Sequence, residues 1–231
     1  MILTAHQPAY LPWLGYFDKL IRSDIFIFLD TVQYEKNSFI NRNRIKTPQG
    51  AIWLTVPIKT KGHTHSTVLE TQIRNSENWR KKHLKSIFLN YKKAPRSEEC
   101  YPKLEILYQQ EHELLADLCF EHLRFWLKEM KIEKNIVRSS RLPISSKKSD
   151  LILDLCKYFS ANHYISGPLG KNYIKEEDFL QAGISIEYQN YQHPKYPQLW
   201  GSFLTGMSIV DYWLNTNQYW LITRGERNQI F

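Results

Sequence analysis

The stretch that decides the fold is residues 1–29, MILTAHQPAYLPWLGYFDKLIRSDIFIFL. Its first five residues are mostly apolar, which predicts a buried first strand. Pro8 and Pro12 then restrict the backbone, because each proline fixes its own φ and disfavours helix at the residue before it. Residues 13–21 carry apolar side chains at helical spacing, and residues 24–29 are a strand candidate. This order predicts a βαβ unit with two parallel strands.

The rest of the chain continues the alternation of strand and helix. The pattern predicts further strands at residues 51–58, 135–139, 163–166 and 184–188, and helices at residues 79–91, 111–130, 150–159, 176–181 and 203–214. Alternation of this kind is typical of an α/β fold, here an open, mostly parallel Rossmann-like sheet with helices on both faces. We expect one domain over residues 1–231, with a mainly helical insertion at about residues 75–131 and a flexible loop at residues 59–66.

Composition and charge narrow the function classes. Hydrophobic residues make up 42% of the 231 residues, which is enough for a substantial core, and the net charge of +8 favours an anionic partner. No apolar run approaches the length of about 20 residues that spans a bilayer, and the three cysteines form no CxxC pair. We therefore expect a soluble, cytoplasmic protein without a membrane span. No RNA or DNA recognition motif occurs, so nucleic acid is an unlikely partner.

Three polar or glycine-containing loops are expected at the carboxyl ends of strands, where open parallel sheets bind ligands: residues 6–11, 30–44 and 166–173. In the first loop, His6 is a candidate base or phosphate ligand, and it could equally be a histidine that only hydrogen-bonds the strand end. Gln7 can donate and accept hydrogen bonds. Tyr10 and Trp13 offer rings on which a sugar or base could stack.

The second loop is rich in cations and amides. Arginine side chains match phosphates and carboxylates with two parallel hydrogen bonds, so this segment predicts an anion site, with a solvated loop as the alternative interpretation. The residues concerned are Lys36, Asn37, Asn41, Arg42, Asn43 and Arg44.

The third loop, Ser166-Gly167-Pro168-Leu169-Gly170-Lys171, has small residues that would let backbone amides approach a ligand, although a plain turn explains it as well. A later segment, residues 191–200 with Tyr196 and Gln198, could form a rim over the site or an ordered coil over the core. Neither GxxxxGK[ST] nor GxGxxG occurs. GxSxG, HExxH and metal-type histidine spacing are also missing, so no cofactor or metal is indicated by motif.

Several separated motifs resemble one family. The stretches HQPAYLPWLGYFDKL, DIFIFLDTVQYEKNSFINRNRIK and WLTVPIK in the N-terminal half, and ISGPLGKNYI, YQHPKYPQLWGSF and MSIVDYWLN in the C-terminal half, resemble the WbqC-like family in order and over nearly the whole chain. Asn215-Thr216-Asn217 departs from the glycine-containing turn expected there. The resemblance implies a role in bacterial surface polysaccharide (O-antigen) biosynthesis, where an amino sugar carries an acyl or aminoacyl group.

The resemblance also implies a set of site residues. These are His6, Gln7, Tyr10, Lys36, Asn37, Asn41, Arg42, Ser166, Gly167, Tyr173 and Gln198. We expect a transferase acting on a nucleotide-linked amino sugar, with His6 and Lys36 as catalytic residues and His6 as the base that deprotonates the amine. The cations of the second loop would hold phosphates, and the other residues named above, with Gly15, Lys171 and Tyr196, would bind substrate.

Other functions remain open at this point. HIGH-type nucleotidylyltransferases place HxGH at the start of the first helix, where this chain has Trp13-Leu14-Gly15-Tyr16. The glycine and its position fit, but both histidines are missing; this alternative would use ATP with magnesium. A third possibility is a non-catalytic module that binds a sugar nucleotide or glycan. The donor, the acceptor and the oligomeric state are not predicted.

Overall fold

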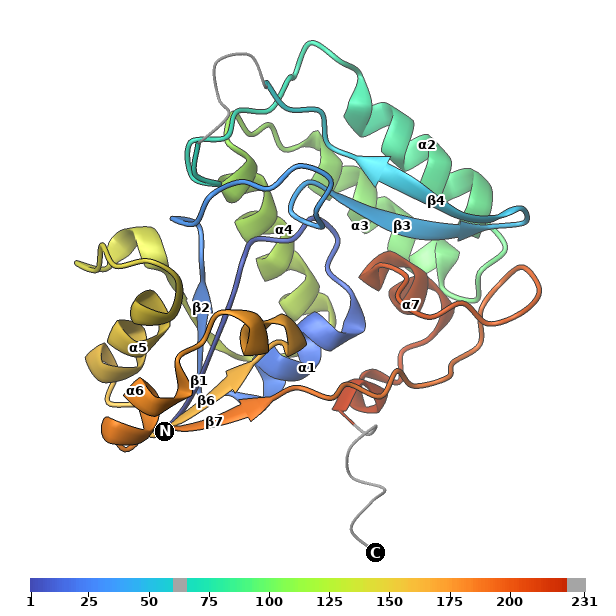
Figure 1. The fold of residues 1–231 in the computed structure, drawn as a ribbon. Helices are drawn as coiled ribbons and strands as arrows, with labels where there is room; N and C mark the ends of the chain where they lie inside the picture. Colours follow the sequence, from blue (N-terminus) through green and yellow to red (C-terminus); the bar gives the residue numbers. More distant parts are fainter. Residues whose placement is uncertain (60–65, 224–231) are drawn as a thin grey trace, which may run out of the picture.

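The computed structural model describes residues 1–59 and 66–223, with a five-stranded sheet at its centre (Figure 1). The strands are β1 (Ile2–His6), β2 (Ile25–Phe28), β5 (Asn135–Arg138), β6 (His163–Ser166) and β7 (Ser185–Tyr188). They lie in the order β5-β2-β1-β6-β7, and every neighbouring pair is parallel. The prediction of an open, Rossmann-like parallel sheet is therefore confirmed. Residues 60–65 of the predicted flexible loop lie outside the described residues.

Helices cover both faces of this sheet because successive strand residues point to opposite sides. Along β2, Ile25 and Ile27 belong to the hydrophobic cluster under α5 and α6, whereas Phe26 and Phe28 belong to the cluster under α1 and α4 (Figure 1). The helices are α1 (Leu14–Arg22), α2 (Trp79–Tyr91), α3 (Ser97–Gln109), α4 (Leu115–Glu129), α5 (Lys148–Tyr158), α6 (Glu176–Gln181) and α7 (Ile209–Asn215), with short 3₁₀ turns at Ser139–Arg141 and Pro168–Asn172. Within the described ranges, none has both the length and the apolarity to cross a bilayer.

One predicted strand does not belong to the sheet. The segment at residues 51–58 was expected as a third sheet strand, but β4 (Gly50–Thr55) pairs in antiparallel fashion with β3 (Arg42–Thr47) and forms a separate hairpin. The strand β3 was hidden in the sequence because Asn43 occupies a buried position that would normally be apolar. Its amide donates to Leu11 O at 2.5 Å and accepts from Arg44 N at 2.8 Å, which satisfies the buried polar group.

Two helices also differ from the prediction. The helix α3 was not predicted, because Pro102 interrupts its apolar pattern; Cys100, Leu104 and Leu107 nevertheless share its buried face. The last helix was expected from residue 203 but begins at Ile209, since Gly206 has φ +68° and the backbone there is not helical.

The strand order creates a switch point between β1 and β6. From β1 the chain adds β2 and β5 on one side of the sheet, then crosses to add β6 and β7 on the other. At such a point the connections leave in opposite directions, and a crevice opens beyond the carboxyl ends of the two strands. His6, the last residue of β1, and Ser166, the last residue of β6, therefore lie at this crevice.

Candidate functional site

A cavity of about 310 Å³ lies at this switch point. It is bounded by the ends of β1 and β6, the first turns of α1 and the segment after β7. The lining residues are His6, Trp13, Gly15, Lys19, Gly167, Pro168, Gln189, Asn190 and Tyr191. Four of the residues named from sequence, His6, Trp13, Gly15 and Gly167, thus meet in one cavity.

The His6 imidazole is fixed in orientation. Its Nδ1 lies 2.9 Å from Gln7 O, so Nδ1 carries the hydrogen and Nε2 is the accepting nitrogen. The ring also contacts Trp13 and Tyr16, with centroids 5.4 and 4.7 Å away. Burial lowers the pKa of His6 to about 3, and the nearby charge of Lys19 adds to this. The imidazole is therefore neutral at physiological pH.

Lys19 is the second titratable group of the cavity, and sequence reasoning did not identify it. Its side chain is on α1, the residue is 2% exposed, and Nζ donates to Ala5 O at 3.1 Å. A Cβ on Gly167 would lie 3.8 Å from this nitrogen, so the glycine leaves space beside the amine. Burial lowers the pKa of Lys19 from 10.5 to about 7, opposed by the charge of Asp18.

The neighbouring carboxylate has other partners. Gln189 donates through Nε2 to Asp18 Oδ2 at 2.7 Å and to Gly15 O at 2.8 Å. Arg22 lies 3.7 Å from the same carboxylate and also pairs with Glu187. Asp18 thus ties α1 to Gln189, the residue that follows β7, and Arg22 ties the same helix to Glu187 on β7. Burial raises the pKa of Asp18, whereas the hydrogen bond from Gln189 and the charge of Arg22 lower it.

A run of aromatic rings leads out of the cavity to the β3–β4 hairpin. Trp13 contacts Phe39 with centroids 5.1 Å apart, and Phe39 contacts Trp53 at 5.8 Å. Phe39 is 39% exposed and Trp53 is 44% exposed, although both are large apolar side chains. The guanidinium carbon of Arg42 lies 4.3 Å from the Trp53 ring centroid, and that of Arg44 lies 5.6 Å away. Rings and cations therefore share one surface, which we call the hairpin platform (Phe39, Arg42, Arg44, Trp53).

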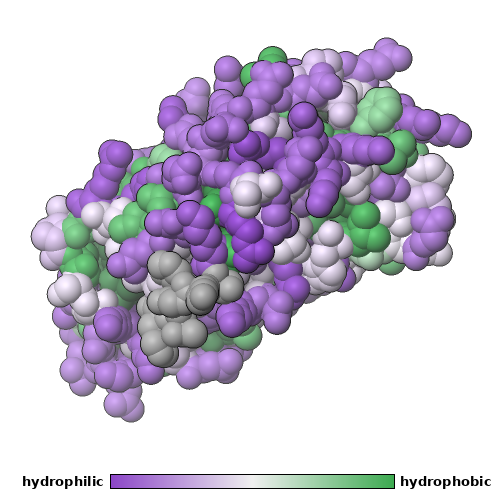
Figure 2. Space-filling model, turned by 90° about the horizontal axis from the view of Figure 1, so that it is seen from above, coloured by the Kyte–Doolittle hydropathy of each residue, from purple (hydrophilic) through white to green (hydrophobic). Residues whose placement is uncertain are grey.

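Local contacts hold the cations of the second loop in place. Arg42 donates to Asn37 Oδ1 at 3.2 Å and to Asn37 O at 2.5 Å, and Arg44 donates to Gly206 O at 3.3 Å. Asn41 is buried and donates to Val56 O, whereas Lys36 is exposed. From above the molecule, on the side of the hairpin, the surface is mostly hydrophilic with smaller apolar areas between (Figure 2). Asn37 thus positions Arg42 of the hairpin platform through hydrogen bonds to its guanidinium group. Asn41 holds the hairpin backbone through its bond to Val56 O.

Tyr10 lies in the core. It is fully buried, and its hydroxyl lies 2.8 Å from His83 Nδ1 and 2.5 Å from Tyr108 Oη. Its ring contacts Trp79 and His122, with centroids 6.3 and 5.7 Å away. Its side chain is therefore not available to stack on a ligand, and Trp13, Phe39 and Trp53 provide the accessible rings.

Tyr196 and Gln198 belong to a separate buried network. Both donate to Asp211 Oδ2, at 2.6 and 2.8 Å. The same glutamine accepts from Lys46 Nζ at 3.0 Å, and Tyr91 donates to Asp211 Oδ1 at 2.8 Å. These bonds join the hairpin, α2 and α7 to the segment at residues 196–204, which gives the two residues a structural role.

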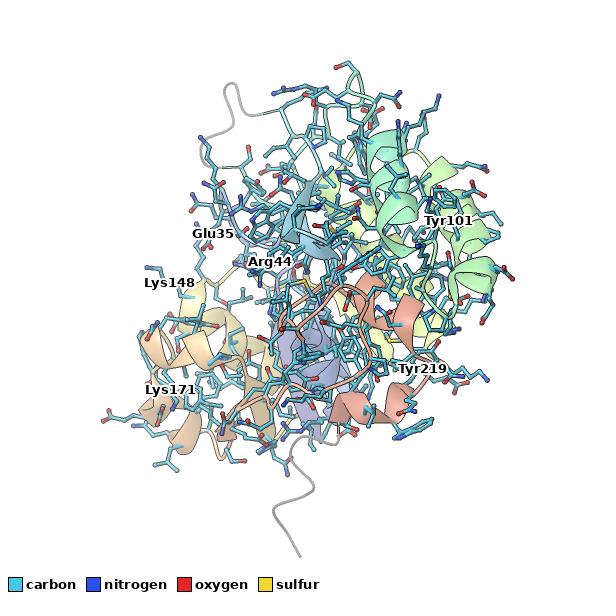
Figure 3. All side chains as sticks on the ribbon, turned by 90° about the vertical axis from the view of Figure 1, so that its right-hand side faces the viewer. Glu35, Arg44, Tyr101, Lys148, Lys171 and Tyr219 are labelled. Atoms are coloured by element: carbon cyan, nitrogen blue, oxygen red, sulfur yellow. The ribbon has the colours of Figure 1, made fainter. Side chains whose placement is uncertain are left out.

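The loop after β6 also contributes one predicted residue to the cavity, while its other predicted residues lie outside it. Gly167 lines the cavity, but the Ser166 hydroxyl donates to Gly167 O at 3.0 Å and packs against Gly170. Lys171 and Tyr173 are exposed, and Lys171 lies 5.3 Å from the Tyr188 ring. Figure 3 shows Lys171 well away from Arg44. Lys171 and Tyr173 therefore do not line the cavity.

A larger hollow, of about 560 Å³, lies between α4 and the start of β5. It is bordered by residues such as Arg124, Lys134 and Asn135. Because Asn135 begins β5, this hollow is at the amino end of the sheet, opposite to the edge where parallel sheets bind ligands. In the described ranges no group of three or more His, Cys, Asp or Glu side chains is arranged to hold a metal ion.

Comparison with known proteins identifies relatives. The model of the WbqC-like protein family matches residues 7–219. An uncharacterized protein of Mycobacterium tuberculosis, Rv1507c, is 34% identical over 211 residues, which cover 90% of this chain and 91% of the relative. No solved structure matches this chain.

Proposed function

This chain belongs to the WbqC-like protein family, and we propose that it transfers an acyl or aminoacyl group to the amine of a nucleotide-linked sugar. The observation that carries the proposal is the continuity between the switch-point cavity and the hairpin platform, through His6, Trp13 and Phe39. A cavity for the reacting groups and a ring-and-arginine surface for a nucleotide diphosphate would then form one extended site. We place the reaction in the cytoplasm, in bacterial surface polysaccharide biosynthesis, and the three free, buried cysteines suit a reducing compartment.

The nucleotide would bind at the hairpin platform. Exposed aromatic rings stack on any nucleobase, and each such contact contributes about 1–3 kcal/mol. Arg42 and Arg44 present guanidinium groups beside the Trp53 ring, and guanidinium pairs well with diphosphate oxygens. Lys36, exposed in the same segment, adds a further positive charge for the phosphates.

The sugar amine would react in the cavity. Its nitrogen forms a bond to the donor's carbonyl carbon, the bond to the leaving group breaks, and the amine loses a proton. His6 presents Nε2 as an acceptor, because Gln7 O fixes the hydrogen on Nδ1. With its pKa lowered to about 3, the imidazole is a weak base. It would therefore orient the amine and receive its proton only as the new bond forms.

Thermal unfolding against a panel of nucleotides, nucleotide sugars and acyl donors tests the proposal. A ligand that binds only the folded chain stabilises it by RT ln(1 + [L]/Kd), or about 2.7 kcal/mol at 100 times its Kd. We expect a shift with nucleotide sugars that Arg42→Ala removes and that Arg124→Ala, an exposed arginine on α4, leaves intact. His6→Ala should keep the shift and lose turnover.

Other outcomes would change the assignment. Stabilisation by ATP with magnesium, and not by nucleotide sugars, would favour a nucleotidyl-transferring enzyme; Gly15 does lie in the first turn of α1, directly after β1 and its loop. Binding of nucleotide sugars without turnover for any acyl donor would favour a non-catalytic binding module. Salt-dependent affinity for DNA that is unaffected by His6→Ala would instead indicate nucleic-acid binding.

A further inference from the structure

The switch-point cavity has one charged side chain among its lining residues. Lys19 supplies it; the remaining lining residues are neutral, since His6 does not carry a charge at physiological pH. None of the described residues that line the cavity carries a carboxylate. A ligand that enters this space therefore meets a single amine with no acidic group facing it.

We propose that this cavity binds a carboxylate group, with the Lys19 ammonium as its counter-charge. The proposal concerns a ligand class for the cavity and does not depend on the transfer reaction or on the hairpin platform.

The first support is the incomplete bonding of a buried amine. An ammonium group has three donors, and within residues 1–59 and 66–223 Nζ of Lys19 bonds to one acceptor, Ala5 O. Asp18, its neighbour in sequence, is already engaged by Gln189 and Arg22. Burying a cation without full pairing is unfavourable, so the folded chain is more stable when an anion completes the site.

The second support is the shape of the cavity around that amine. Gly167 presents no side chain where a Cβ would lie 3.8 Å from Nζ, which leaves room for a ligand atom there. Trp13 and Gly15 place the first turn of the nine-residue helix α1 along the same cavity. The amino end of a helix carries a partial positive charge, which adds to the attraction for an anion. One amine and one helix end match a single negative charge better than a phosphate dianion.

Binding should be linked to proton uptake. In the free cavity the pKa of Lys19 is about 7, so the amine is about half neutral at that pH. A bound carboxylate favours the ammonium form and raises this pKa. Among the described residues, the other titratable groups near the amine are His6 on β1, Asp18 on α1 and Tyr191 in the segment after β7, with Arg22 and Glu187 beyond Asp18. The pKa of His6 is too low for it to titrate in the same range.

Carbon-13 NMR of the full chain with lysines labelled at Cε measures this directly. One signal, assigned through its loss in Lys19→Gln, should titrate near pH 7. Saturating acetate should move its midpoint upward by one pH unit for each tenfold preference for the ammonium form. Acetamide, which has nearly the same shape and no charge, is the matched control and should leave the midpoint in place.

Two results would overturn the proposal. If acetate moves the Lys19 midpoint no further than those of exposed lysines such as Lys36, the cavity does not bind a carboxylate. If inorganic phosphate moves it and acetate does not, the ligand is a phosphoryl group instead. The comparison of acetate with acetamide uses the unaltered chain and therefore stands even if Lys19→Gln fails to fold.

Discussion

Two lysines of this protein are buried to the same degree but in very different surroundings. Lys19, in the cavity, is 2% exposed, and Lys46, in the hairpin, is 1% exposed. Nζ of Lys46 donates to Gln198 Oε1 at 3.0 Å and to Ser202 O at 2.6 Å, whereas Nζ of Lys19 bonds to Ala5 O. The depth of burial therefore does not distinguish the two lysines, whereas the hydrogen-bond partners separate the structural Lys46 from Lys19, which we propose binds a ligand.

The hydrogen-bond network around Lys46 ends at the carboxylate of Asp211. Asp211 accepts from Tyr91, Tyr196 and Gln198, and the last of these accepts from Lys46 in turn. Burial raises the pKa of Asp211, and the bonds from these three side chains oppose that change. Because every member has partners from another element, the network fixes how the hairpin packs against α7.

The largest expected effect is the loss of stability in Lys46→Met. The substitution leaves Gln198 Oε1 with one donor fewer, since it keeps only the bond from Leu204 N, and it leaves the Ser202 carbonyl without its lysine partner. A hydrogen bond to a charged group contributes about 1.5–3 kcal/mol, and two such bonds are lost, so we expect a loss of roughly 3 kcal/mol in the free energy of unfolding. Urea denaturation measures it, with Lys36→Met, at an exposed position, as the control. Equal values for the two variants would remove the structural role assigned to Lys46.

Lys19→Met should instead increase the free energy of unfolding, by an amount that depends on pH. The folded-state pKa of Lys19, about 7, lies below its ordinary value of 10.5, so between these pH values the unfolded chain binds one more proton than the folded chain. The stability of the unaltered protein therefore rises as pH increases through this window. The variant lacks this contribution, so its advantage over the unaltered protein should be greatest below pH 7 and shrink toward pH 10. Denaturation at pH 6 and pH 9 tests this; a constant difference would contradict the assigned pKa.

The fold was predictable from sequence where the pattern was local. The β1–α1–β2 unit and the later parallel strands follow from apolar runs and their spacing. The β3–β4 hairpin did not, because Asn43 is buried with its amide satisfied by Leu11 O, so no alternation of apolar and polar residues was visible. A hydrogen bond between a buried polar side chain and a carbonyl far away in sequence depends on the tertiary structure, so no local sequence pattern reveals it.

The candidate site was predictable only in part. His6 and Gly167 come at strand ends, and strand ends of a parallel sheet meet at one edge, so their proximity could be expected. Lys19 was missed because a lysine on a helix is usually solvent-exposed, and only the packing shows that α1 is buried on all sides from Leu14 to Leu20. Gln189 likewise has no recognisable sequence signature, since its role depends on a hydrogen bond to Asp18 on α1, which is far away in sequence.

The hairpin offers a way to separate structural from binding side chains within one element. Lys46 points into the buried network, whereas Trp53 on the paired strand is 44% exposed. Trp53→Ala removes the ring contacts with Arg42 and Phe39 and should cost only about 1 kcal/mol of stability. It should weaken nucleotide-sugar binding by about 5- to 150-fold, the equivalent of 1–3 kcal/mol for a lost stacking contact. Calorimetric titration gives the affinity, and Trp220→Ala, at another exposed tryptophan, is the control. Unchanged affinity would remove the hairpin platform from the site.

The smallest effect on stability is expected for Gly167→Ala, which tests the space beside Lys19. The backbone at Gly167 has φ −68° and ψ 163°, which alanine adopts without strain, and the new methyl would lie 3.8 Å from Nζ, an ordinary contact. Stability should then change by less than about 0.5 kcal/mol. The methyl nevertheless occupies part of the cavity and shields the amine from water, so the pKa of Lys19 should fall below 7 and acetate should bind more weakly. Gly170→Ala is the contrasting variant, because its Cβ would lie 1.9 Å from Ser166 Oγ and must displace that side chain. If Gly167→Ala left both the Lys19 titration and acetate binding unchanged, the space beside the amine would not be where the ligand lies.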